Sequence, residues 1–179
     1  MAQDHSSYAA KIKITEELEN MGDKVSCGPL VLAYDEYNQE RDSVRIHYNP
    51  TREEHSWLST DRFPSLQHAF KKSLEYASES YPATYFTSST WLNNVPDFIK
   101  LFPDSFNKQM ENRGEGSFLG MWGQFIKSNG YGNEERLKDF IAELETVNTF
   151  EKAIEAIPLK VLEGVGLLDE FYSMYAIKK

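Results

Sequence analysis

The chain has 179 residues, a formal net charge of −9 and a pI of about 5.0. A chain of this length can bury roughly 70% of the surface that it exposes when unfolded, so it needs no disulfide or metal to fold as one domain. Its negative charge repels phosphate backbones and anionic lipid surfaces, which argues against nucleic acid and membranes as partners.

Cysteine usage and the chain ends predict a cytoplasmic protein. Cys27 is the single cysteine, which is typical of a reducing compartment. The N-terminus lacks the basic start and apolar stretch of a signal peptide, and no apolar run approaches the roughly 20 residues of a membrane helix. We expect a single domain over residues 1–179, with residues 1–7 as a disordered tail.

The first third of the chain predicts a helix followed by a hairpin. Apolar residues at loose helical spacing favour a helix over residues 8–21. Residues 30–34 form a short apolar run, and residues 43–48 alternate between apolar and polar side chains, so both are expected to be strands. The charged stretch 35–42 between them is typical of a hairpin loop, which predicts an antiparallel pair.

The middle of the chain predicts a long helix, a strand and a short helix. After a polar loop at residues 51–63, a helix begins near Pro64, where a missing N–H costs nothing, and ends near Ser80. β-Branched and aromatic residues predict a strand over residues 84–90. Asn93 and Asn94 are placed to cap a short helix that begins at Pro96, contains Phe98, Leu101 and Phe102 and ends at Pro103.

The last third predicts a glycine-containing strand and three helices. Residues 117–126 are expected to form the strand, with a bulge at its glycines. Asn133 and Thr149 are expected to cap two helices, the second ending at Pro158. A final amphipathic stretch follows, with its apolar face formed by Leu168, Phe171, Tyr172 and Tyr175. Together these elements predict an α+β fold with a mixed, largely antiparallel sheet flanked by helices.

No motif with a known mechanism identifies a reaction. The chain lacks a phosphate-binding P-loop, a dinucleotide-binding glycine motif and a nucleophile elbow, and neither its histidines nor its single cysteine form a metal pattern. No metal site is expected. His47, on the polar side of its strand, is the one candidate general base, although a solvent-facing strand residue is the alternative.

Two segments contain polar and aromatic side chains suited to ligand binding. Ser88, Ser89 and Trp91 lie where the strand 84–90 ends, and sheet ends often line pockets. The alternative role of the four hydroxyls at Thr87, Ser88, Ser89 and Thr90 is to cap the following turn through side-chain bonds to the backbone. Trp122 and Gln124 lie beside glycines at positions 120 and 123, which would let a ligand or another backbone segment come close. A core tryptophan packed under a bulge is the alternative.

The same segments resemble a family of uncharacterised bacterial proteins over roughly the second half of the chain, from near Phe63 onward. The matching stretches are Ser89–Asn94, Leu101–Pro103, Met121–Ile126, Ile157–Leu162 and Phe171–Ile177. This sequence has Thr90 where the family usually has serine before the tryptophan. The family implies no activity.

The Ser89–Leu92 segment is also distantly similar to the C-terminal part of GNAT-like acyltransferase domains. That similarity implies a mixed sheet with helices on both faces and acyl-coenzyme A as cofactor. The chain departs from the pattern because it lacks the Arg/Gln-x-x-Gly-x-Gly/Ala loop that holds the pyrophosphate in those enzymes.

Two functional hypotheses follow. The first is a small-molecule-binding or acyltransferase-like domain in which Trp91 and Trp122 form pocket walls while Ser88, Ser89 and Gln124 orient the ligand. The alternative is a non-catalytic interaction module, with the aromatic residues 171–175 forming a homodimer or partner surface. Packing of that stretch on its own sheet is the competing interpretation.

Overall fold

The computed structural model describes residues 24–34, 42–48, 56–112, 121–127 and 129–178. The helix expected over residues 8–21, most of the expected loop 35–42 and the first part of the expected loop 51–63 lie outside the described residues. The strands are β1 (Lys24–Cys27), β2 (Leu30–Tyr34), β3 (Ser43–Tyr48), β4 (Tyr85–Thr90), β5 (Glu111–Asn112) and β6 (Leu162–Leu167). The helices are α2 (Phe63–Ser80), the 3₁₀ helix η1 (Trp91–Asn94), α3 (Pro96–Ile99), α4 (Asp104–Asn107), α5 (Glu134–Leu144), α6 (Phe150–Glu155) and α7 (Leu168–Met174).

The strands form one six-stranded sheet with the order β1-β2-β3-β4-β6-β5. The pair β3–β4 is parallel, and the other neighbouring pairs are antiparallel. The hairpin predicted from residues 30–34 and 43–48 is confirmed as β2–β3, with Leu32 opposite Ile46. The α+β class and the mixed, largely antiparallel sheet are therefore confirmed.

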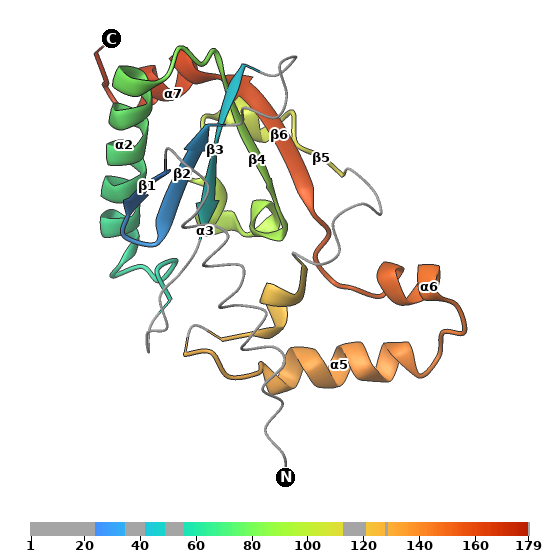
Figure 1. Cartoon of the computed structure of the whole chain (residues 1–179). Helices are drawn as coiled ribbons and strands as arrows, with labels where there is room; N and C mark the ends of the chain where they lie inside the picture. Colours follow the sequence, from blue (N-terminus) through green and yellow to red (C-terminus); the bar gives the residue numbers. More distant parts are fainter. Residues whose placement is uncertain (1–23, 35–41, 49–55, 113–120, 128, 179) are drawn as a thin grey trace.

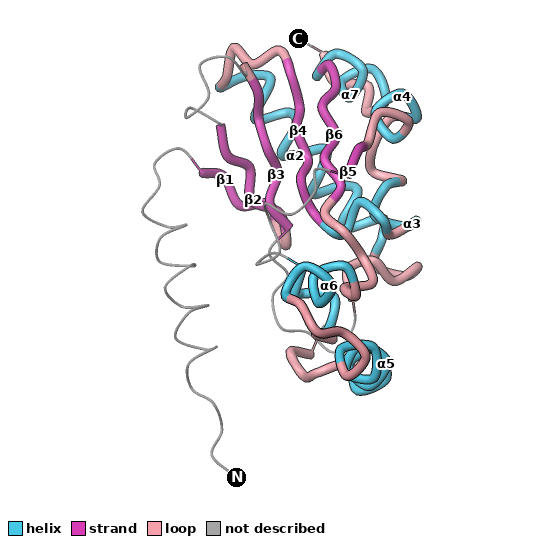
Figure 2. Tube along the Cα trace, turned by 90° about the vertical axis from the view of Figure 1, so that its right-hand side faces the viewer, coloured by secondary structure: helices cyan, strands magenta, loops and turns pink. Residues whose placement is uncertain are grey.

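Four helices pack on one face of the sheet (Figures 1 and 2). The buried residues of these helices form the main core together with Val44 of β3 and Phe86 of β4. The helices contribute Phe70 from α2, Phe98 from α3, Phe106 from α4 and Phe171 from α7. Neighbouring rings meet closely, and the centroids of Phe86 and Phe171 are 4.5 Å apart. Large aromatic side chains thus fill most of the layer between sheet and helices.

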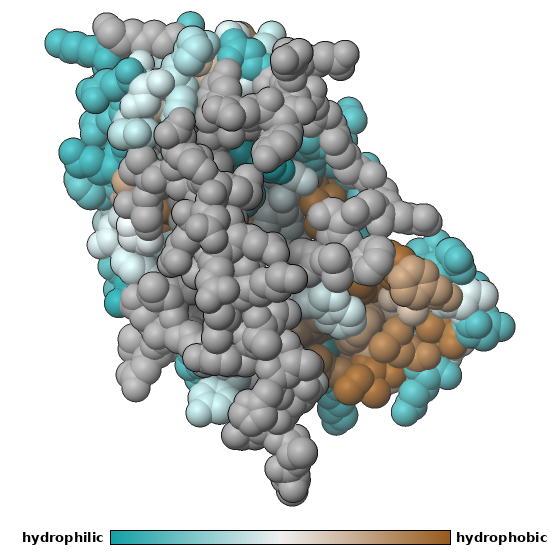
Figure 3. All heavy atoms as spheres, in the orientation of Figure 1, coloured by the Kyte–Doolittle hydropathy of each residue, from teal (hydrophilic) through white to brown (hydrophobic). Residues whose placement is uncertain are grey.

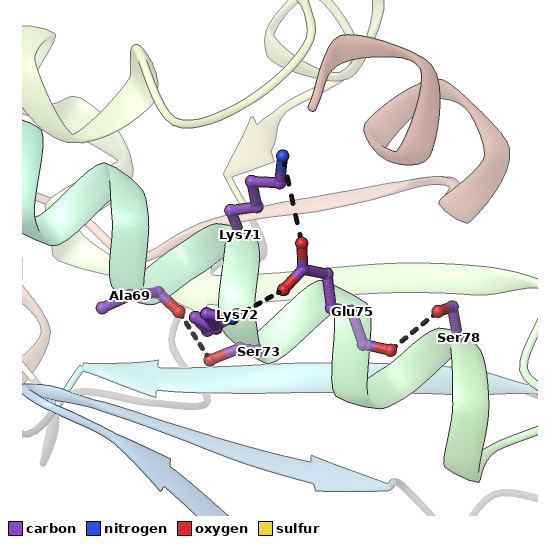
Figure 4. Close-up of polar contacts among 6 residues, drawn as sticks. All are labelled: Ala69, Lys71, Lys72, Ser73, Glu75 and Ser78. Atoms are coloured by element: carbon purple, nitrogen blue, oxygen red, sulfur yellow. Dashed lines mark hydrogen bonds and ion pairs between the residues drawn. The ribbon is translucent and has the colours of Figure 1, made fainter. Parts of the chain in front are cut away.

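Helix α2 has one apolar and one polar side, as its sequence predicts. Leu66, Phe70, Leu74 and Ala77 are buried against the sheet. The buried Ser73 hydroxyl donates to the Ala69 carbonyl 3.1 Å away, so it needs no partner outside its own helix (Figure 4). On the solvent side, the ammonium groups of Lys71 and Lys72 lie 3.9 and 3.4 Å from the Glu75 carboxylate (Figure 4). Such exposed pairs contribute little stability.

A second, smaller core forms the small lobe, which we define as residues 121–127 and 129–161. Its buried side chains come from the segment 121–125, from α5 and from the stretch after α6, and they are Met121, Phe125, Phe140, Ala156, Ile157 and Val161. Asn133 caps α5 by accepting from the Arg136 N–H at 3.4 Å, and Thr149 caps α6 by accepting from the Lys152 N–H at 3.3 Å. Both predicted caps are confirmed.

The strand predicted over residues 117–126 is wrong in the part that the structure describes, because residues 121–125 form a 3₁₀ helix. Met121, Gln124 and Phe125 are buried while Trp122 and Gly123 are exposed. Spacings of three and four residues place the buried side chains on one face of a helical turn, and strand alternation would have placed Met121 and Gln124 on opposite faces.

Three other predictions also need correction. The short helix from Pro96 ends at Ile99 instead of continuing to Phe102, and α4 begins after Pro103. Asn93 and Asn94 lie in η1 and leave α3 without a side-chain cap. Helix α6 ends at Glu155, before Pro158.

Strand β6 was not predicted, because its glycines lower its strand propensity. They are needed there because the Phe106 ring lies directly against the strand. A Cβ atom added to Gly164 would lie 2.6 Å from the Phe106 ring, and one added to Gly166 would lie 2.7 Å from it. The fold therefore depends on two residues without side chains in a strand that lies between β4 and β5.

The C-terminal aromatic stretch belongs to the main core. Phe171, Tyr172 and Tyr175 are buried, and the Tyr175 hydroxyl donates to the Leu101 carbonyl at 3.0 Å. Burial raises the pKa values of both tyrosines, with Asp169 adding to the effect at Tyr172. These three side chains face their own core, which is the packing that the competing interpretation describes.

Candidate functional site

The hydroxyl-rich end of β4 is a structural turn. Thr90 caps η1 by accepting from the Leu92 N–H at 3.2 Å, as the capping alternative describes for this hydroxyl. Ser88 is buried and donates to the Asn93 side-chain oxygen at 2.9 Å, while the Asn93 amide donates back to the Ser88 carbonyl at 3.3 Å. The Ser88 hydroxyl is thus already engaged within the turn.

Ser88 and Ser89 point to opposite faces of the sheet. Ser88 is on the same side as Phe86, toward the main core, whereas Ser89 is exposed. His47, which is half-buried, alternates in the same way with the core residue Val44 and so faces the side of Ser89. The structure therefore groups His47 with Ser89 and separates both from Ser88.

The two predicted tryptophans lie on different cores. Trp91 packs against the main core, and its indole also covers Gly123, where an added Cβ atom would lie 3.1 Å from the Trp91 Nε1 atom. Trp122 is 48% exposed and contacts the rings of Phe125 and Phe140 in the small lobe. The close approach expected at Gly123 is thus made by Trp91 of the same chain.

The Gln124 side chain joins two parts of the small lobe, the turn 121–125 and the segment at Leu159 that leads into β6. It is 2% exposed, donates to the carbonyls of Met121 and Leu159 at 2.8 and 3.1 Å, and accepts from the Leu159 N–H at 2.9 Å. Arg136 of α5 donates to the Gln124 backbone carbonyl at 3.1 Å. The Gln124 side chain therefore satisfies both the N–H and the carbonyl of Leu159, as the backbone of a neighbouring strand would do.

Asparagine amides of η1 bind the same segment from the side of the main core. Asn94 donates to the Lys160 carbonyl at 2.7 Å, and Asn93 donates to the Leu162 carbonyl at 2.8 Å. We call the side chains of Asn93, Asn94 and Gln124 the amide joint. Asn93 and Gln124 are buried and Asn94 is half-buried. The amides of Asn93 and Asn94 hold the end of the small lobe against the sheet, and Gln124 holds the lobe itself together.

Lys160 fastens the same segment to α6. Its ammonium donates to the carbonyls of Ile154 and Glu155, each at 2.7 Å, and so satisfies the C-terminal end of that helix. Burial lowers the pKa of Lys160, and the carboxylates of Glu155 and Glu143 partly oppose this effect. The contacts of Lys160 are structural.

Two surface hollows lie away from these residues. One, of about 380 Å³, is found where α2 ends and α7 begins, and it is lined by Ser78, Tyr81, Pro82, Ala83, Thr84, Leu167 and Asp169. The other, of about 460 Å³, is a shallow depression that is largely open to solvent along one face of α5, and its lining residues all come from that helix and its C-cap: Glu134, Leu137, Lys138, Ile141, Ala142 and Glu145. We call the second hollow the α5 groove. His47, Ser88, Ser89, Trp91, Trp122 and Gln124 line neither of them.

The α5 groove lies in a part of the surface where large apolar side chains are exposed. Ile141 is 53% exposed at its centre, and Leu137 is half-buried beside it. Elsewhere on the small lobe Trp122, Tyr131 and Phe150 are exposed as well. Figure 3 shows apolar atoms gathered over the part of the molecule where Figure 1 places α5. An apolar surface of this kind marks interaction sites more often than a folding requirement.

Sequence reasoning identified α5 without its groove. A signal was present, because Leu137, Phe140, Ile141 and Leu144 form a wider apolar stripe than a small core can cover. Phe140 is 5% exposed while its neighbour Ile141 is 53% exposed. Which edge of the stripe the lobe covers is decided by the packing of residues 121–125 and α6 against it.

Comparisons with protein-family models, curated proteins and solved structures find no match to this chain. Among the described residues, no group of three or more His, Cys, Asp or Glu side chains is arranged to hold a metal ion. No helix in the described ranges has the length and apolar character needed to cross a membrane.

Proposed function

We propose that this chain is a non-catalytic interaction module that binds an amphipathic helix of another protein in the α5 groove. The observation behind the proposal is the exposure of Ile141 between Leu137 and Ala142 on one side of α5. Isolated exposed apolar residues are common, but here the apolar floor is elongated and follows a helix axis. A second helix laid along such a floor buries apolar residues at helical spacing.

The residues predicted to form a pocket at the end of β4 contact groups of their own chain, which favours the interaction module as the function. Ser88 and Gln124 direct their polar atoms to groups of their own chain, and Trp91 fills the space at Gly123. In the proposed function these residues hold the small lobe in place. The partner surface is then on α5 instead of the C-terminal aromatic stretch.

A labelled peptide tests this proposal on the full chain. The probe is an 18-residue amphipathic helix with leucine on one face and glutamine on the other, and a scrambled peptide of the same composition is its control. We expect the amphipathic peptide to bind more tightly in fluorescence anisotropy. Ile141→Asn should weaken binding about tenfold, because loss of a central apolar contact costs roughly 1–2 kcal/mol.

Met174→Asn is the matched variant, since Met174 is 45% exposed and lies on α7 outside the small lobe. It should leave the affinity unchanged. Equal binding of the amphipathic and scrambled peptides, or equal effects of the two variants, would remove the α5 groove as a docking site.

A second candidate function is a small-molecule-binding, acyltransferase-like domain of GNAT-like architecture. It is supported by the placement of His47 and Ser89 on the same sheet face as Thr87, whose register partner on β3 is Arg45. In this function His47 would be the general base. A rise in melting temperature with acetyl-coenzyme A that is kept in His47→Ala, together with acetyl transfer that is lost in this variant, would support it. No shift up to millimolar acetyl-coenzyme A would refute it.

A further inference from the structure

We infer that the partner helix is basic at both ends of the contact and neutral or acidic at its middle, an inference that rests on the proposed function. The ends of the α5 groove are marked by Glu134 and Glu145, and Lys138 lies between them. All three side chains are exposed. The two carboxylates are separated by about 16 Å along the axis, at 1.5 Å per residue. Cations three turns apart on a partner helix would meet them.

The surroundings reinforce this charge pattern. Glu135, Asp139 and Glu143 are exposed on the remaining surface of α5. Arg136 is directed toward the Gln124 carbonyl and therefore toward the lobe's own backbone. The chain as a whole has a formal net charge of −9. A field of this sign speeds the approach of a basic partner and slows that of an acidic one.

The same pattern disfavours a second copy of the chain as the occupant. Two α5 helices packed antiparallel through their grooves would place Glu134 of one copy opposite Glu145 of the other, at both ends of the contact. Like charges placed directly opposite each other oppose association, and the Lys138 side chains would meet near the centre. The groove is therefore complementary to a helix of different sequence.

Two peptides that differ only in end charge test the inference. Both have a leucine face and a glutamine-rich polar face, and one has lysine and the other glutamate at two positions three turns apart. At low ionic strength we expect the lysine peptide to bind the full chain at least about tenfold more tightly. The ratio should shrink in 0.5 M salt because exposed charges are screened.

Neighbouring glutamates provide the matched variants. Glu134 and Glu135 are both exposed in the first turn of α5, and only Glu134 lines the groove. Glu134→Lys together with Glu145→Lys should reverse the preference between the peptides. Glu135→Lys together with Glu143→Lys changes the net charge equally at exposed positions outside the groove and should preserve the preference. Each substitution at the first turn has the same unfavourable interaction with the helix dipole, so the comparison isolates the position.

The outcomes separate this inference from the proposed function. Equal affinity for both peptides, with Ile141→Asn still weakening the neutral peptide, would overturn the charge pattern alone. An equal effect of the two double variants would show that only net charge matters and would also overturn it. A dimer in sedimentation that Ile141→Asn dissociates would make a second copy the occupant. Failure of every amphipathic peptide would instead overturn the proposed function.

Discussion

The contact between Phe106 and β6 gives a prediction with a defined sign. Replacing a glycine in a strand interior by alanine ordinarily stabilises a protein by about 0.5–1 kcal/mol, because glycine loses more conformational freedom on folding. Gly164 should behave in the opposite way. Its added methyl group would lie 2.6 Å from Cζ and 2.8 Å from Cε1 of Phe106.

The magnitude follows from how little the ring can move. Phe106 is 0% exposed, and its centroid lies 5.0 Å from that of Phe102, 5.3 Å from that of Phe171 and 5.6 Å from that of Phe86. Close-packed rings on three sides leave no space for a shift away from the strand. Overpacking of this kind costs about 1–3 kcal/mol. For a protein of this size the melting temperature should fall by roughly 2–12 °C.

Urea unfolding followed by circular dichroism measures the effect in Gly164→Ala, with Val165→Ala as the neighbouring control. Val165 is 40% exposed on the other side of the strand, so its truncation should cost little. Phe106→Leu destabilises the protein by itself but frees space, so Gly164→Ala should cost less in that background. A neutral or stabilising Gly164→Ala, or strict additivity in the double variant, would refute the packing argument.

Three further predictions concern hydrogen bonds and ionisation. Tyr175→Phe should cost about 1–3 kcal/mol in urea unfolding, because the buried carbonyl of Leu101 loses its donor at 3.0 Å. Stability should decrease as the pH rises above about 10, since Tyr172 and Tyr175 ionise in the unfolded chain near their ordinary pKa of 10.0 while burial raises both pKa values in the folded state. Unchanged urea midpoints between pH 9 and pH 11 would contradict this. Gln124→Leu should lower hydrogen-exchange protection in α5 more than in α2, because it removes bonds that hold the small lobe together; an equal loss in both helices would assign Gln124 a global role.

Local patterns in the sequence determined the helices and strands whose side chains face one core. Alternation over residues 43–48 predicted β3, and the apolar spacing after Pro64 predicted α2. The caps Asn133 and Thr149 were readable because a cap depends on the few residues that follow it. The α+β class follows from these elements together.

Tertiary structure alone decided the remaining features. Strand β6 contains two glycines that lower strand propensity, and only the packing of Phe106 gives them a reason. The helical turn at residues 121–125 is selected by Met121, Gln124 and Phe125 facing one core, although the sequence is equally rich in strand-forming residues. The stabilisation of both elements comes from contacts between residues that are far apart in the sequence, so a short stretch of sequence does not reveal it.

The candidate site divides in the same way. Ser88, Trp91 and Gln124 were noticeable in the sequence because they are polar or aromatic. The role of Gln124 depends on Leu159, which lies 35 residues further along the chain. The width of the apolar stripe on α5 was visible in the sequence. That Phe140 is covered and Ile141 is left exposed is a property of how the small lobe packs, because burial is set by which neighbours a side chain meets in three dimensions.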